Sequence, residues 1–76
     1  MLGFIVRLVN NFEKAHGFKP NLLYINRTHS EHLKNSFDET FSFNQIAEML
    51  RMEIIIEPET MHPHVAWTHV VHRIAS

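Results

Sequence analysis

The chain has no cysteine, little net charge and no long apolar run, and each absence removes a class of function. Without cysteine there are no disulfides, no cysteine-ligated zinc ribbon and no thiol nucleophile, and the composition fits a reducing compartment. A formal charge of −1 is too nearly neutral for a dedicated nucleic-acid binder. The apolar N-terminal segment is far shorter than the roughly 20 residues that span a bilayer, and Arg7 interrupts it, unlike a signal peptide. We therefore predict a soluble, cytoplasmic protein with no membrane partner.

What remains is the composition of one small globular domain. Hydrophobic residues make up 45% of the 76 residues, which is too apolar a composition for a disordered chain. We therefore assign residues 1–76 to a single domain. A domain of this size buries only about 60% of the surface that its unfolded chain exposes. Oligomerisation or a bound metal are the remaining sources of extra stability.

Hydrophobic spacing predicts a helix at the start of the chain and a strand after it. Apolar residues recur at helical spacing from Leu2 to Phe12, and Gly17 is typical of the residue that closes a helix. Phe18 is expected to fold back on Phe12 or its neighbours. Residues 22–26 form a short apolar run, which suits a buried strand.

Two capping boxes predict the starts of two more helices. Thr28 with Glu31 forms the first box and Ser42 with Gln45 forms the second. Three consecutive isoleucines then predict a strand at residues 53–57. Because a strand, a helical crossover and a second strand normally form a parallel pair, residues 22–26 and 53–57 should lie side by side.

These elements predict an α/β fold in the order α-β-α-α-β-(β or short α), with an N-terminal helix and a two-helix crossover between the parallel strands. The last element covers residues 65–74. Its spacing fits a helix, but its content of Val, Trp, Thr and Ile favours a strand, and we favour the strand. The expected core consists of Ile5, Leu8, Phe12, Leu23, Ile25, Leu33, Phe37, Ile46, Leu50, Ile54, Ile56 and Trp67.

Histidine is the residue type in unusual excess, with seven in the chain and four of them in the last fifteen residues: His62, His64, His69 and His72. Pro63 should hold the chain extended, so that the two histidines beside it point the same way and can supply two metal ligands. Zinc needs a third or fourth ligand, for which His69, His72, Glu57 and Glu59 are the candidates. The alternative interpretation is that the histidines are hydrogen-bonded structural residues and solvated surface groups.

Nucleic acid is not expected as a partner, because the positive charges are scattered along the chain. Residues 42–52 look like the first helix of a helix-turn-helix, but the isoleucines that follow disfavour a recognition helix. A weak interaction would depend on the basic residues near one helix start, which are Arg27, His29, His32 and Lys34.

No residue pattern predicts an enzyme. None of the serines lies in a nucleophile elbow, and the adjacent carboxylates of Asp38 and Glu39 fall in a solvated turn. Our leading hypothesis is a small non-enzymatic interaction or assembly protein, a homodimer that uses its over-apolar first helix or an exposed sheet edge. The first alternative is a histidine-based divalent-metal-binding protein without another cofactor, and the second is a weak nucleic-acid-binding protein.

Overall fold

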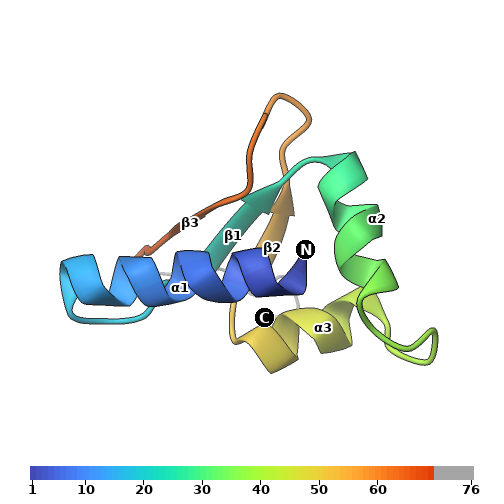
Figure 1. Cartoon of the computed structure of the whole chain (residues 1–76), viewed down its shortest axis with the longest axis horizontal. Coiled ribbons are helices and arrows are strands. Elements are labelled where there is room, and N and C mark those ends of the chain that lie inside the picture. The colour runs from blue at the N-terminus through green and yellow to red at the C-terminus, as the bar shows by residue number, and fades with distance from the viewer. Residues whose placement is uncertain (70–76) are drawn as a thin grey trace.

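Three helices and a three-stranded mixed sheet make up the fold, in a computed structural model that describes residues 1–69. The elements are α1 (Leu2–His16), β1 (Leu22–Ile25), α2 (Arg27–Asn35), α3 (Phe43–Leu50), β2 (Glu53–Ile56) and β3 (His64–Ala66) (Figure 1). The sheet order is β2-β1-β3, with β2 parallel to β1 and β3 antiparallel to it. The predicted α/β class, element order and parallel pair are confirmed. Within the described part of the chain, no helix is long and apolar enough to cross a membrane.

The predicted tail element is confirmed only at its start. Val65 and Ala66 belong to β3, whereas the residues 67–69 that follow are not in a strand. The rest of the predicted segment, residues 70–74, lies outside the described residues. The choice of strand over helix therefore holds for the first residues of the segment.

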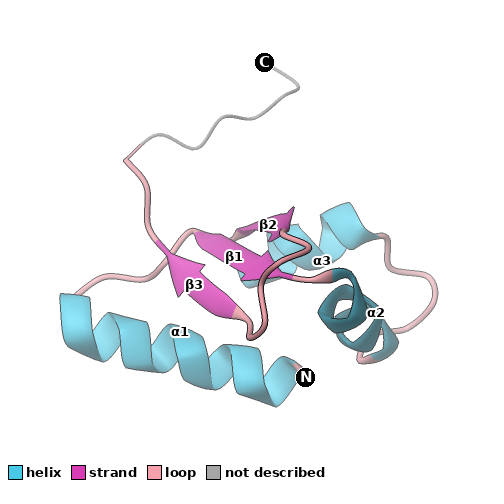
Figure 2. Ribbon diagram, turned by 90° about the horizontal axis from the view of Figure 1, so that it is seen from above, coloured by secondary structure: helices cyan, strands magenta, loops and turns pink. Residues whose placement is uncertain are grey.

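One face of the sheet supports the core. Leu23 of β1 pairs in register with Ile54 of β2 and Val65 of β3, and all three contribute to the same hydrophobic cluster. Each helix adds one fully buried side chain, which is Ile5 from α1, Leu33 from α2 and Ile46 from α3. Figure 2 shows α2 and α3 together at the end of the molecule opposite the C-terminal end of α1.

The start of α2 differs from the sequence prediction. The N-cap is Asn26, whose side-chain oxygen accepts a hydrogen bond from the backbone N–H of His29 at 2.8 Å. The Nδ1 atom of His29 accepts from the backbone N–H of Asn26 at 3.3 Å, which completes a capping box. The predicted box of Thr28 and Glu31 is therefore wrong, because both residues already lie inside the helix.

The start of α3 and the end of α1 follow the prediction. Ser42 and Gln45 form the reciprocal capping box, with hydrogen bonds of 3.2 and 2.8 Å. Gly17 closes α1 in the left-handed conformation at φ 83°, and the ring of Phe18 lies 5.8 Å from that of Phe12. Local chemistry thus sets these two helix ends.

Two residues assigned to the core are exposed instead. Ile56 is 40% exposed and Trp67 is 46% exposed. Ile56 ends β2, which is an edge of the described sheet, and Trp67 lies just past the end of β3. The core instead includes Leu22, which is 8% exposed, and Met52, which is 5% exposed.

Candidate functional site

The histidines predicted to bind metal do not come together in the described residues. His62, His64 and His69 are all exposed, as are Glu57 and Glu59. Within residues 1–69, no group of three or more His, Cys, Asp or Glu side chains lies close enough to hold a metal ion. His72 lies outside the described residues, so a site that includes it stays a prediction.

Several histidines have partners that explain their positions. The ring of His64 stacks on Tyr24 at 4.8 Å, across the antiparallel register of β3 and β1. His29 belongs to the capping box of α2. His16 lies 4.1 Å from the ring of Phe12, and His69 lies 5.8 Å from the ring of Trp67. The imidazoles therefore act here as flat packing partners and as a helix cap.

A continuous group of rings forms at the C-terminal end of α1. The rings of Phe18 and Trp67 meet edge to face at 5.4 Å, and Phe18 also lies 5.9 Å from His16. Pairs of this geometry are favourable beyond the area that they bury. We call this group the aromatic cluster, and its members are Phe12, His16, Phe18, Trp67 and His69.

The aromatic cluster exists because α1 is longer than the sheet that it covers. A helix of 15 residues is about 22 Å long, whereas the four residues of β1 span about 13 Å. Figures 1 and 2 both show the C-terminal end of α1 extending past the strands. Phe12 and His16 continue the stripe that begins at Ile5, seven and eleven positions later. Among the described residues, Phe18 and Trp67 contribute the rings that pack at this end of α1.

The cover is incomplete, so the aromatic cluster is also a surface. Phe18 remains 45% exposed and Trp67 46% exposed. Half-exposed aromatic side chains held in place by neighbouring rings are the type of residue that dominates binding energy at protein interfaces. On α1 itself, Phe4 and Val6 are exposed as well, on opposite flanks of the buried stripe.

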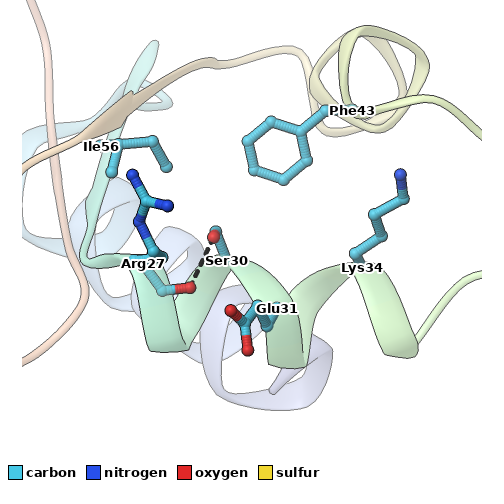
Figure 3. A pocket seen from close by; sticks show the side chains of 6 residues that line it. All are labelled: Arg27, Ser30, Glu31, Lys34, Phe43 and Ile56. Carbon is cyan, nitrogen blue, oxygen red and sulfur yellow. Dashed lines mark hydrogen bonds between the residues drawn. The ribbon is translucent and has the colours of Figure 1, made fainter.

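A second surface feature is a hollow of about 400 Å³ between α2, α3 and the end of β2. Helix α2 contributes four residues at positions i, i+3, i+4 and i+7, which share one helix face. Phe43 from α3 and Ile56 from β2 complete the lining (Figure 3). We call this feature the α2–α3 hollow, and its α2 residues are Arg27, Ser30, Glu31 and Lys34.

The α2–α3 hollow combines an apolar surface with two cations. Figure 3 shows Arg27 reaching toward Ile56 and Lys34 lying at the other end, with the ring of Phe43 between them. The Ser30 hydroxyl donates to the backbone carbonyl of Arg27 at 2.6 Å, so its proton is already committed. Arg27 and Lys34 are two of the four basic residues that the sequence marked for a weak nucleic-acid interaction. Both residues line the same hollow in the structure, together with Phe43 and Ile56, which no sequence pattern places beside them.

Comparison with protein-family models, with curated proteins and with solved structures gives no match for this chain. The functional argument therefore depends on the two surfaces.

Proposed function

We propose that this chain is a small non-enzymatic interaction protein that forms a homodimer through the aromatic cluster. The observation that carries the proposal is the half-exposed pair of Phe18 and Trp67, packed edge to face at the C-terminal end of α1, which extends past the strands. A domain with seven buried hydrophobic residues in its described part has few other ways to bury more apolar area. A second copy offers the same rings, and a two-fold contact pairs such a surface with itself.

The exposed area indicates a weak dimer. Aromatic side chains bury about 150–250 Å² each, so the exposed halves of Phe18 and Trp67 amount to about 200 Å² per protomer. At about 25 cal/mol/Å², two protomers gain about 10 kcal/mol. Association costs about 4–15 kcal/mol. At the low end of this cost about 6 kcal/mol remain, so we expect a dissociation constant between about 40 μM and 1 mM.

Sedimentation analysis over a range of protein concentrations tests the proposal. The wild-type chain should pass from monomer to dimer, while Trp67→Ala and Phe18→Ala should stay monomeric to at least tenfold higher concentration. Met61→Ala is the matched control, because Met61 is 80% exposed and lies in the loop before β3, outside the aromatic cluster. Circular dichroism of each variant shows whether it remains folded.

A monomer at millimolar concentration would refute the homodimer. Equal effects of Met61→Ala and Trp67→Ala would show that association is not specific to the aromatic cluster. The single tryptophan of the chain offers an independent measurement, because its fluorescence should change on dilution only if Trp67 becomes buried in the dimer.

A further inference from the structure

We propose that the α2–α3 hollow binds a small anion that carries a planar ring, of about the size of a nucleoside monophosphate. This site is separate from the aromatic cluster, and the proposal does not depend on dimer formation. The hollow has a volume of about 400 Å³, which lies within the range of about 300–1,000 Å³ that is usual for small-molecule sites.

Recognition of the anion comes from Arg27 and Lys34. They lie seven residues apart on α2, so their backbones are about 10 Å apart along the helix axis. Within the described residues neither side chain makes a hydrogen bond or an ion pair, so both remain available. The one carboxylate of the lining, Glu31, lies on the α2 side and away from Phe43 in Figure 3. The lining therefore has a net positive charge in a chain whose formal charge is −1.

Recognition of the ring comes from Phe43 and Ile56. Phe43 is half-buried and makes no ring contact with another aromatic side chain of residues 1–69. Ile56 is 40% exposed, although its register partner Ile25 is fully buried. A planar ring placed against these two side chains would cover apolar surface that the fold leaves open.

The arrangement favours a small ligand over a nucleic-acid strand. A strand requires several phosphate contacts along a basic groove, but the lining of the hollow holds only two cations. Lys14 belongs to α1, Lys19 follows α1, and Arg51 ends α3, so none of these charges lines the hollow. A mononucleotide needs no more than the two cations and one apolar wall.

An NMR titration of the full chain with AMP tests the proposal. Amide signals of Ser30, Phe43 and Ile56 should shift saturably, with a dissociation constant of about 0.1–1 mM. Adenosine, which lacks the anion, and inorganic phosphate, which lacks the ring, should each bind at least tenfold more weakly. Because both charges are exposed, Arg27→Ala and Lys34→Ala should each weaken AMP binding by about two- to fivefold.

Lys14→Ala is the matched control, since Lys14 is also an exposed helical lysine but does not line the hollow. It should leave the affinity unchanged. The proposal is overturned if AMP gives no saturable shift, if adenosine binds as tightly as AMP, or if Lys14→Ala weakens binding as much as Lys34→Ala. An octanucleotide that binds at least tenfold more tightly than AMP would also overturn it, in favour of a nucleic-acid surface.

Discussion

Asn26→Ala is expected to destabilise this protein more than the loss of an ordinary helix cap. The Asn26 side chain has two roles at the junction of β1 and α2. Its oxygen caps α2 by accepting from the His29 N–H at 2.8 Å, and its Nδ2 atom donates to the Thr60 carbonyl at 2.9 Å. The second bond ties the start of α2 to the loop between β2 and β3, across 34 positions of sequence.

The expected loss of stability is the sum of the contributions of these two hydrogen bonds. Loss of an N-cap side chain costs about 1 kcal/mol. Loss of the bond to Thr60, a residue only 9% exposed, leaves a carbonyl without this partner and costs about 1–2 kcal/mol more. We therefore expect Asn26→Ala to lower the free energy of unfolding by about 2–3 kcal/mol. For a domain of this size the melting temperature should fall by about 10–20 °C.

The chain contains its own control, because the Ser42 capping box has the same local geometry and the Ser42 side chain makes no hydrogen bond to any of residues 1–69 outside α3. Ser42→Ala should cost only about 1 kcal/mol. Urea unfolding measured by circular dichroism compares the two variants, and Asn26→Asp separates the roles because it keeps the capping oxygen but removes the donor. If Asn26→Ala costs no more than Ser42→Ala, the bond to Thr60 does not contribute to stability and the argument is refuted.

Two other pairs of variants test the backbone and the core. Gly17→Ala should lower the free energy of unfolding by about 1 kcal/mol, because Gly17 has a φ of 83°. Gly3→Ala in α1 should raise it by about 0.5–1 kcal/mol. Thermal melts in which both variants shift the melting temperature in the same direction would contradict this. Apart from the chain neighbours and the helix's own backbone, no atom of residues 1–69 lies within 4 Å of the new Cβ at either position. Leu23→Ala should cost about 3–5 kcal/mol, because Leu23 is 0% exposed. Ile56→Ala should cost less than about 1.5 kcal/mol, because Ile56 is 40% exposed. If urea unfolding shows the same loss of stability for Ile56→Ala as for Leu23→Ala, Ile56 belongs to the core.

The two predicted capping boxes show what local sequence can and cannot determine. The box at Ser42 was predictable because the chain around it offers no competing start. At α2 the pattern of Thr28 and Glu31 competes with that of Asn26 and His29, and an imidazole is not the usual capping-box partner at position N3. The end of β1 at Ile25 and the bond from Asn26 to Thr60 favour the earlier start. Both depend on the tertiary structure, which cannot be read from a pattern of neighbouring residues.

The candidate surfaces were less predictable than the fold, for a reason of geometry. The sequence predicts a core position for Trp67, because large aromatic residues usually contribute to cores and its neighbours have strand-like composition. Its exposure depends on where β3 ends relative to α1, which follows from pairing register and element length together. The hollow has the same origin, since Arg27 and Phe43 are sixteen positions apart and line one hollow only in the folded chain.

The excess of histidine has an explanation that composition alone does not suggest. The partnered imidazoles of residues 1–69 lie in three separate places: His16 and His69 belong to the aromatic cluster, His29 lies at the start of α2, and His64 lies on β3. A metal site needs its ligands to converge on one point, whereas a flat side chain that both stacks and accepts hydrogen bonds is useful wherever a small domain has a half-covered ring or an open helix end. A domain with a small core has many such places, because a large share of its aromatic residues lies at the surface. The dispersal of the histidines is therefore what packing predicts.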